Sequence, residues 1–489
     1  MSAVLQSLAA RSPGDVVMHD GEQSLTAAAV RDAVSRCRDE LEKLPPGAVA
    51  SRLDNGMAAA VLDLALAASA RPHIALPPFF TEAQAAHAST SAVAMALPSK
   101  AESLLDRLHW RTLDDSPRAL PAGTAIVTYT SGSTGAPKGV CLDRALPERV
   151  ASSLVEAMAA LGVRRHLSLL PLGVLLETIG GLYAPLLAGG EVHLPSLATV
   201  GHRGSAGLDM PALLATLHRH APESIILVPQ LLQGLVTAAE AGAALPRSLR
   251  MIAVGGARVP LSLLGRAAAL GLPVYEGYGL SECASVVALN RPGARRAGSV
   301  GRPLPHARLR VDGDGEVWVD GPAFLGYTGE AARAPGPYAT GDLGEFDSEG
   351  FLHLRGRRKA MYITAWGRNV SPEWLESELV QHPLIAQAFV WGEGRVQGAA
   401  VLVPRRVDVS QVALERAVAE VNSGLPDYAR VAAVLAADEP FTAANGLLTG
   451  NGRPRREALF QRYGDALAAA PDPHARPVLS VSRPESIHP

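Results

Sequence analysis

The chain has 489 residues, 48% of them hydrophobic, and 47 glycines, so it is long enough to fold around more than one hydrophobic core. Its net charge is −2 and its pI is near 6.7, which excludes an overall basic field that would attract nucleic acid or an anionic membrane. The three cysteines are widely separated and have no metal-like spacing, which argues against a disulfide framework or a cysteine zinc site. We therefore expect small molecules or proteins as partners.

The amino-terminal region carries few chemical signals. Its first residues lack the basic start and the long apolar core of a signal peptide, and the apolar stretch near 57–70 is interrupted by Asp63. We expect no membrane span and a cytoplasmic protein. Residues 22–120 alternate helix-like Ala/Leu stretches with short apolar runs, and Thr81-Glu82 predicts the start of a capped helix.

A segment rich in glycine and hydroxyl residues follows the predicted buried strand 125–129. Backbone N–H groups at glycines and side-chain hydroxyls can bind phosphate oxygens, and a lysine adds a positive charge. The alternative is a flexible surface loop, but Lys138 is one of only four lysines among 45 basic residues. The residues expected to bind phosphate are Thr130, Ser131, Gly132, Ser133, Thr134, Gly135 and Lys138.

This segment differs from the GxxxxGK[ST] nucleotide-binding loop. Lys138 is followed by Gly139 and Val140, where that loop has a hydroxyl residue on magnesium. The usual P-loop is therefore excluded.

The region 210–280 predicts a βαβ arrangement, which implies parallel strands whose ligands bind beyond their carboxyl ends. Gly255-Gly256 and Gly277-Tyr278-Gly279 fall at such ends. The predicted strands are 225–228, 251–254 and 273–276, with a helix at 260–270 between the last two.

Further along, 306–320 and 345–354 alternate apolar residues around polar turns, which predicts two hairpins of a small antiparallel subdomain. Beyond residue 359 the pattern changes to a compact mixture of helices and strands. It predicts a helix capped by Ser371, strands at 385–391 and 399–403, an amphipathic helix at 411–421, and a disordered tail over 466–489.

Two short motifs carry further chemistry. In the stretch Tyr278 to Glu282 an aromatic ring could lie against adenine and the carboxylate could hold Mg²⁺, although a core tyrosine and a solvated glutamate would look the same. In Thr340-Gly341-Asp342 the carboxylate could accept ribose hydroxyls, with Arg357 nearby in sequence, although aspartate is also a common turn former.

The order and spacing of these motifs, ending in Gly356-Arg357-Arg358-Lys359, resemble those of the AMP-forming adenylating enzymes over residues 20–465. This family includes acyl- and aryl-coenzyme A synthetases, adenylation domains and luciferases. The resemblance implies an α/β fold. A large N-terminal domain (1–358) has parallel-rich sheets with flanking helices and a small antiparallel β subdomain, and a smaller, mobile α+β C-terminal domain (359–465) turns about Lys359.

The resemblance also implies the reaction. A carboxylate attacks the α-phosphate of ATP, pyrophosphate leaves, and the acyl group passes from acyl-AMP to the thiol of coenzyme A or of a carrier-protein phosphopantetheine. By this resemblance the catalytic residues are Lys138, Glu282 and Arg453, and the magnesium ligands are Glu282 and Thr134. Besides the phosphate-binding residues, ATP is expected to contact Gly256, Tyr278, Gly279, Ser281, Asp342 and Arg357.

The sequence departs from the family pattern at two places. Arg453 stands where the family usually has a lysine that bridges carboxylate and phosphate, and the planar guanidinium does not reproduce a compact ammonium group. Trp366 and Gly367 stand where many coenzyme A synthetases have two glycines in the thiol passage. Trp366 could narrow that passage, stack on the adenine of coenzyme A, or pack under the domain.

The resemblance places the acyl pocket beside Leu175, Leu176, Val228 and Gly255. Amino-acid-activating relatives have an aspartate near Leu176, and only Glu177 lies close to that position here. The leucines favour a medium- to long-chain fatty acid. Aryl acids, a carrier-protein or amine acceptor, and a catalytically inactive nucleotide-binding homologue are the alternatives.

Overall fold

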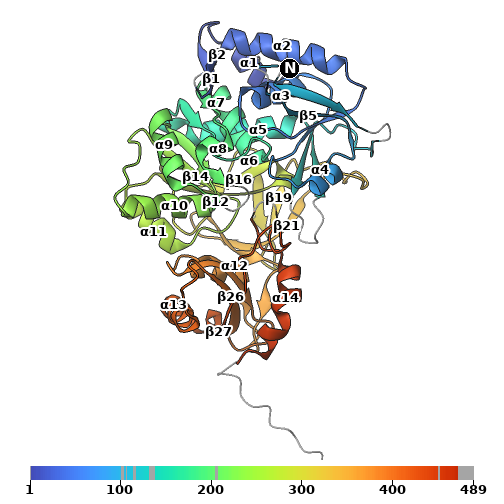
Figure 1. Cartoon of the computed structure of the whole chain (residues 1–489). Helices are drawn as coiled ribbons and strands as arrows, with labels where there is room; N and C mark the ends of the chain where they lie inside the picture. Colours follow the sequence, from blue (N-terminus) through green and yellow to red (C-terminus); the bar gives the residue numbers. More distant parts are fainter. Residues whose placement is uncertain are drawn as a thin grey trace, which may run out of the picture. The chain divides into compact units, whose positions relative to one another are not determined.

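A computed structural model of the chain (Figure 1) describes residues 2–21, 23–100, 104–105, 107–113, 117–130, 138–203, 207–449 and 452–471. The chain folds into two compact units. The larger unit contains Met1–Arg358 and Thr442–Arg455, and the smaller contains Lys359–Phe441 and Arg456–Pro489. The sequence analysis assigned 442–455 to the C-terminal domain, whereas this segment clusters with the larger unit.

A nine-stranded sheet forms the centre of the larger unit. Its middle strands, from β15 to β1, are parallel to their neighbours, as the βαβ pattern predicted. In order, the strands are β17 (Arg302–Pro303), β16 (Ser285–Leu289), β15 (Val274–Leu280), β14 (Met251–Val254), β13 (Ser224–Leu227), β9 (Arg165–Leu167), β10 (Glu191–His193), β1 (Val16–Asp20) and β2 (Gln23–Thr26).

A second, seven-stranded sheet holds the strand predicted at 125–129. In order, its strands are β20 (Gly326–Tyr327), β8 (Lys138–Leu142), β7 (Ile126–Thr130), β4 (His73–Ala75), β3 (Ala48–Ser51), β5 (Ala92–Pro98) and β6 (Leu108–Thr112). β7, β4, β3 and β5 run parallel, whereas β8 runs antiparallel to β7. The carboxyl end of β7 and the amino end of β8, which flank residues 131–137, therefore lie side by side.

Helices cover these sheets with their apolar faces. The capped helix predicted at Thr81 is confirmed, because the Thr81 hydroxyl and the Gln84 side chain form a capping box. In Figure 1, α9, α10 and α11 lie together beside β14. The helices are α1 (Ala3–Ala9), α2 (Ala27–Glu42), α3 (Met57–Ala68), α4 (Glu82–Ala88), α5 (Ala145–Met158), η1 (Ala159–Leu161), α6 (Leu175–Glu177), the π-helix η2 (Thr178–Tyr183), α7 (Ala184–Leu187), α8 (Leu197–Val200), α9 (Met210–His220), α10 (Pro229–Glu240), α11 (Leu261–Ala269) and η3 (Ser281–Cys283).

The two predicted hairpins form one antiparallel sheet of four strands, β18 (Arg308–Val311), β19 (Glu316–Asp320), β21 (Tyr338–Phe346) and β22 (Leu352–Arg357). Another short antiparallel pair joins β11 (His202–Arg203) to β12 (Gly207–Leu208). The small subdomain and the α/β class are therefore as predicted.

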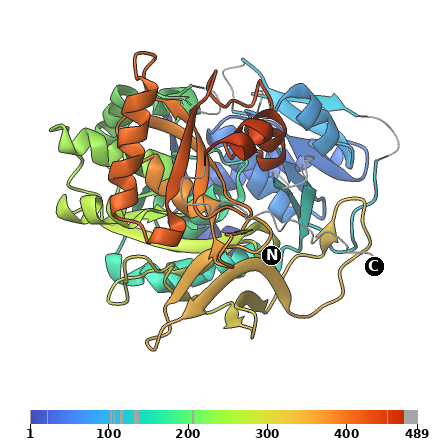
Figure 2. The same ribbon diagram turned by 90° about the horizontal axis from the view of Figure 1, so that it is seen from below.

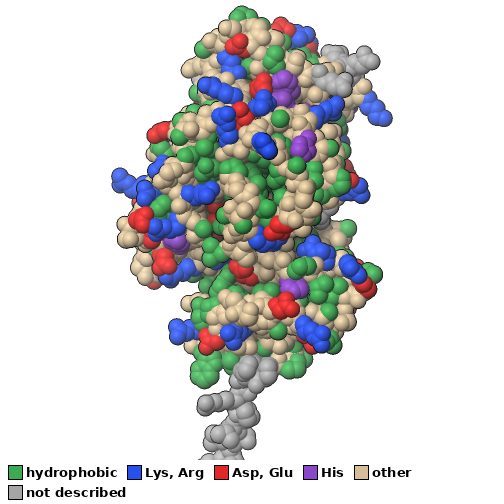
Figure 3. All heavy atoms as spheres, turned by 90° about the vertical axis from the view of Figure 1, so that its left-hand side faces the viewer, with side chains coloured by type: hydrophobic (Ala, Val, Ile, Leu, Met, Phe, Trp, Pro, Cys, Tyr) green, Lys and Arg blue, Asp and Glu red, His purple; other side chains and the backbone are tan. Residues whose placement is uncertain are grey.

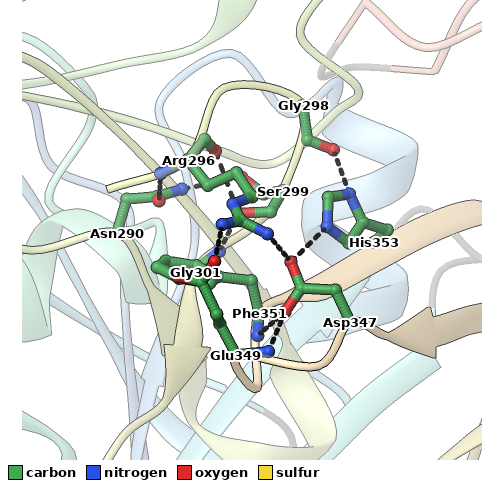
Figure 4. Close-up of polar contacts among 9 residues, drawn as sticks. All are labelled: Asn290, Arg296, Gly298, Ser299, Gly301, Asp347, Glu349, Phe351 and His353. Atoms are coloured by element: carbon green, nitrogen blue, oxygen red, sulfur yellow. Dashed lines mark hydrogen bonds and ion pairs between the residues drawn. The ribbon is translucent and has the colours of Figure 1, made fainter. Parts of the chain in front are cut away.

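The turn between β21 and β22 is tied to the loop that follows β16 (Figure 4). Asp347 accepts hydrogen bonds from the backbone of Glu349 and Phe351 and contacts His353 Nε2 at 3.1 Å. Arg296 of the loop forms ion pairs with Asp347 and Glu349. These contacts fix the far end of the hairpin that carries Asp342 and Arg357.

The smaller unit contains the predicted Ser371-capped helix, α12 (Pro372–Leu379), and the predicted strand β25 (Ile385–Trp391). Figure 2 shows α13 (orange) and α14 (red) on opposite sides of its sheet. The remaining elements are β23 (Tyr362–Ile363), β24 (Asn369–Val370), β26 (Gly398–Pro404), α13 (Gln411–Ser423), η4 (Asp427–Ala429), β27 (Val431–Ala436) and α14 (Arg456–Ala469). α14 continues to Ala469, past residue 466 where the sequence analysis began its tail.

Surface charge is mixed. On the face drawn in Figure 3, basic and acidic side chains alternate with apolar and neutral ones, in keeping with the small net charge. Among the described residues, no helix has both the length and the apolar character needed to cross a bilayer.

Candidate active site

Two neighbouring strands flank the glycine-rich segment in the sequence. Thr130 ends β7, Lys138 begins β8, and the two residues are direct partners in the ladder. The predicted phosphate contacts Ser131, Gly132, Ser133, Thr134 and Gly135 lie outside the described residues. The two ends of the segment are thus fixed by strand pairing.

Lys138 and Glu282 are brought together by Tyr327. The Lys138 ammonium lies 4.9 Å from the centre of the Tyr327 ring, which is cation–π distance. The Tyr327 hydroxyl donates a hydrogen bond to Glu282 Oε1 at 2.9 Å. Lys138 also forms an ion pair with Glu330 at 3.4 Å. The predicted phosphate lysine and the predicted magnesium carboxylate therefore share one tyrosine.

Tyr327 was not among the residues predicted for the site. It lies on β20, and β20 pairs with β8 so that Tyr327 opposes Val140. Burial, then the Glu282 charge, raises the pKa of Tyr327, and the same two causes raise the pKa of Tyr338 to about 12. Both hydroxyls therefore stay protonated and can act as donors near Glu282. No local pattern at residue 327 signals this contact.

Tyr278 and Asp342 form a second pair. The Tyr278 hydroxyl donates to Asp342 Oδ2 at 2.6 Å, and Arg357 Nε lies 3.0 Å from Asp342 Oδ1. Asp342 and Arg357 are ladder partners on β21 and β22, which explains why the two motifs meet. Burial, then the Asp342 charge, raises the pKa of Tyr278 well above its usual value, so Tyr278 remains a donor.

Gly279 allows the backbone to turn closely at this site. A Cβ at Gly279 would lie 1.5 Å from the Ser285 carbonyl oxygen, so only glycine fits. The chain then enters the single turn η3, which contains the predicted residues Ser281 and Glu282. The tight approach of β15 and β16 thus directs Glu282 toward Tyr327.

Arg453 reaches the carboxyl end of β14. Its Nη2 donates to the Gly256 carbonyl oxygen at 2.5 Å, and its backbone pairs with that of Thr449 at 2.8 Å. Gly256 has a φ of +83°, which favours glycine, and lies next to Gly255 at the strand end. The cation predicted for the reacting centre therefore lies beside a residue predicted to contact ATP.

The residues predicted for the acyl wall come from three elements. Leu175 and Leu176 lie in α6, Val228 precedes α10, and Gly255 follows β14. Leu175 is 7% exposed, and Leu176 packs against two of the apolar clusters of the larger unit. A Cβ at Gly256 would contact Val228 at 3.9 Å, so Val228 and the Gly255-Gly256 turn are neighbours.

Glu177 lies in the core next to His166. It is fully buried, its Oε1 lies 3.2 Å from His166 Nε2, and His166 Nδ1 lies 2.8 Å from the Ser224 hydroxyl. A Cβ at Gly181 would lie 2.3 Å from Glu177 Oε1, so the π-helix leaves space for this cluster. Glu177 is thus engaged in the core.

In the smaller unit, Lys359 is exposed in the turn after β22. Trp366 and Gly367 form the turn between β23 and β24, where Gly367 has a φ of +71°. Trp366 is 66% exposed, which disfavours the alternative that it packs under the domain. Its neighbours in the turn are also exposed, so most of the Trp366 side chain is open to solvent.

Comparison with protein families decides the assignment. The model of the AMP-binding enzyme family matches residues 5–328, and that of the AMP-binding enzyme C-terminal domain matches residues 360–471. The chain belongs to the AMP-binding enzyme family. It is therefore an enzyme of the AMP-forming adenylating superfamily, as the motifs predicted.

Curated relatives and solved structures agree with this family. A 2-succinylbenzoate–CoA ligase of Bacillus velezensis is 32% identical over 358 residues, which span 69% of this chain and 68% of the ligase. A long-chain-fatty-acid–CoA ligase of Mycobacterium bovis is 42% identical over 159 residues, only 31% of this chain and 26% of that ligase. The fold is similar to that of an anthranilate CoA ligase bound to anthranoyl-AMP, with a TM-score of 0.79, 18% identity and coverage of 96% and 98%.

The described residues of this AMP-binding enzyme suit a magnesium–nucleotide complex. Glu282 Oε1 is held by Tyr327, and within the described chain its Oε2 accepts no hydrogen bond. Mg²⁺ commonly takes one or two carboxylates and completes its shell with phosphate oxygens and water. One oriented glutamate beside Lys138 fits that pattern.

A buried carboxyl group missed by the sequence analysis lies near the acyl wall of the AMP-binding enzyme. Glu276 is 9% exposed on β15, its Oε2 has no partner among the described residues, and the backbone of Val259 bonds to its carboxyl group. Burial raises the pKa of Glu276 to about 8, against weaker lowering by Arg258 and Val259. Glu276 is therefore mainly protonated at neutral pH.

The substitution Glu276→Gln tests this protonation. A carboxyl group with a raised pKa binds more protons in the folded state, so wild-type stability falls as pH rises from about 4.5 to about 8. The variant lacks this loss and is expected to be more stable at pH 9 by a few kcal/mol, at about 1.4 kcal/mol per pKa unit. The measurement is urea unfolding of both proteins at pH 5, 7 and 9. A stability difference that does not change with pH would contradict the raised pKa.

Proposed function

We propose that this enzyme activates an apolar carboxylic acid as acyl-AMP and transfers the acyl group to the thiol of coenzyme A. The main support is the arrangement of the predicted residues. Lys138 and Glu282 contact the same tyrosine, Tyr278 and Asp342 are hydrogen-bonded, and Arg453 reaches Gly256. These are the residue types that a triphosphate, a magnesium ion and a reacting carboxylate require.

In the proposed first step, a carboxylate oxygen of the acid attacks the α-phosphorus, and the bond between the α-phosphorus and the bridging oxygen breaks. Pyrophosphate leaves with the bond electrons. Lys138 and the glycine-rich segment neutralise its charge, and Arg453 stabilises the negative charge at the reacting phosphorus. Mg²⁺ on Glu282 would neutralise phosphate charge, while Tyr278, Asp342 and Arg357 hold the nucleoside.

For the acid, an aryl acid is the better-supported class. Relatives that align with more than two thirds of this chain include a 2-succinylbenzoate–CoA ligase and feruloyl-CoA synthases. A protonated Glu276 beside the Gly255-Gly256 turn can donate a hydrogen bond to a polar ring substituent while keeping the pocket uncharged. An aromatic acid with one hydrogen-bonding substituent agrees with these relatives and with a hydrogen bond from Glu276.

A medium- to long-chain fatty acid is the second candidate. The apolar wall of Leu175 and Leu176 and the 42% identity to the long-chain-fatty-acid ligase favour it. Glu177 is fully buried and one of its carboxylate oxygens already contacts His166, which disfavours binding of an amino-acid ammonium group. A fatty acid has no polar substituent that could accept a hydrogen bond from Glu276. This difference separates the two candidates.

Two residues of the smaller unit support coenzyme A as the acceptor of the acyl group. Lys359 is the expected hinge, and the exposed Trp366 ring beside Gly367 could stack on the adenine of coenzyme A. A carrier-protein phosphopantetheine or an amine would need no such adenine contact. Coenzyme A is therefore the first acceptor to test.

The experiment is ATP–pyrophosphate exchange with labelled pyrophosphate across substituted benzoates and straight-chain acids. We expect exchange with aryl acids, then acyl-CoA formation when coenzyme A is added. Exchange only with straight-chain acids would favour the fatty acid candidate. Product formation only with a phosphopantetheinylated carrier or an amine would overturn the acceptor. ATP binding without exchange for any acid would support the inactive homologue.

A further inference from the structure

A group of potential metal ligands lies far from the nucleotide residues. His19 on β1 and His193 on β10 are direct partners in adjacent parallel strands, and Glu191 precedes His193 by two residues. Side chains two apart on a strand project from the same face. Met18 and Val192, which alternate with them, are fully buried on the other face. Three strands, β14, β13 and β9, separate β10 from β15.

The geometry of the three side chains suits one small cation. His19 Nε2 lies 3.2 Å from Glu191 Oε2, and His193 Nε2 lies 3.4 Å from Glu191 Oε1. One ligand atom from each residue lies within 4.8 Å of the others. A tetrahedral zinc site with bonds of about 2.0–2.1 Å has ligand separations of about 3.3–3.4 Å. Each carboxylate–imidazole distance has the length of such an edge, although His19 faces Oε2 and His193 faces Oε1, so only one of the two is an edge when a single Glu191 oxygen binds the ion.

The two imidazoles face each other on adjacent strands. The rings of His19 and His193 stack with centroids 4.1 Å apart and an interplanar angle of 9°. Because a metal ion lies in the plane of each imidazole that binds it, one of the two rings must turn about its Cβ–Cγ bond when both bind the same ion. Their side chains are 25% and 10% exposed and that of Glu191 is 29% exposed, so solvent can reach the group. A cation bound here could thus keep a water molecule as its fourth ligand.

His220, at the end of α9, supplies the outer hydrogen bond that metal-bound histidines usually make. Its Nδ1 lies 2.9 Å from His193 Nδ1, so only one of these two atoms carries a proton. When His193 Nδ1 is the donor, its Nε2 has a free lone pair directed at Glu191. When His220 is the donor, His193 Nε2–H bonds to Glu191. The same residues can therefore hold either a cation or a hydrogen-bonded network without gaining a proton.

We propose that His19, Glu191 and His193 form a binding site for a divalent transition-metal ion, with Zn²⁺ as the best match. Two imidazoles and one carboxylate are ligands that zinc accepts, whereas Mg²⁺ prefers oxygen ligands alone. The site joins β1 to β10 and so fastens the amino-terminal strands to the sheet. It is separate from Glu282 and does not depend on the proposed function.

The test uses the untagged full chain after treatment with a chelator. Zinc binding is measured by titration calorimetry, and its effect on stability is measured by thermal unfolding. We expect one equivalent to bind and to raise Tm. His19→Gln and Glu191→Gln should each weaken binding at least tenfold, and His109→Gln, an exposed histidine on β6, is the matched control. Since His19 is partly exposed, its variant should stay folded, and the unliganded Tm checks this.

Two results would overturn the proposal. One is the absence of zinc binding by the wild-type chain at millimolar concentration. The other is binding that His19→Gln and Glu191→Gln leave unchanged, which would locate the ion elsewhere. Excess Mg²⁺ should not displace the bound zinc, and displacement at equal concentration would also count against this ligand set.

Discussion

Replacing Arg453 with alanine is expected to lower the rate of ATP–pyrophosphate exchange by about 10²–10³-fold, the effect typical of removing one group that stabilises transition-state charge. Arg453 is held at the carboxyl end of β14 by its bond to the Gly256 carbonyl oxygen. The loss should fall on the maximal rate, with a small change in the KM for ATP, because the guanidinium acts on charge that develops during the reaction.

Arg453→Lys separates charge from geometry. It keeps the cation and is expected to preserve or raise the exchange rate, although lysine lacks the planar fork. Arg416→Ala, on the exposed face of α13, is the matched control and should leave the rate unchanged. If Arg453→Lys abolished exchange, or Arg453→Ala stayed within twofold of wild type, Arg453 would not act at the reacting centre.

Glu282→Gln is expected to lower exchange about 100-fold at millimolar magnesium, because the glutamine keeps the shape but not the charge that binds the ion. The glutamine oxygen can still accept the hydrogen bond from Tyr327, so the fold around η3 should be retained. The measurement is the exchange rate as a function of magnesium concentration. Higher magnesium should recover part of the activity.

Glu330→Gln is the control for this variant. Glu330 is an exposed carboxylate that pairs with Lys138 rather than with Tyr327. Its variant should keep the wild-type magnesium dependence. Equal losses in the two variants would mean that the general negative charge near Lys138 matters, and an unchanged magnesium curve for Glu282→Gln would remove Glu282 from the metal site.

Most elements that carry the motifs were predictable from local patterns. β-Branched runs marked β7 and β14, polar turns marked the two hairpins, and Ser371 marked the start of α12. These features depend on neighbours a few residues apart, which the sequence displays directly. The family could be recognised from the sequence for the same reason, since its motifs are short and occur in a fixed order.

Contacts between distant segments were not predictable in this way. Tyr327 bonds to Glu282 across 45 residues, and Arg453 bonds to Gly256 across 197 residues. In the sequence Glu276 is only one residue of an apolar strand, whereas in the structure burial raises its pKa. The local sequence around Trp366 is equally compatible with a packing role, and only the exposure of its side chain disfavours that role.

The amino-acid sequence by itself determined the family, the strands and helices that carry the motifs, and the residue types expected to meet ATP. The tertiary structure decided which of these residues touch: Tyr327 between Lys138 and Glu282, Asp342 between Tyr278 and Arg357, and the pairing of His19 with His193. The physical reason is that a side chain's partners and its burial depend on strand pairing between segments far apart in the chain, whereas turns and periodicity are encoded locally.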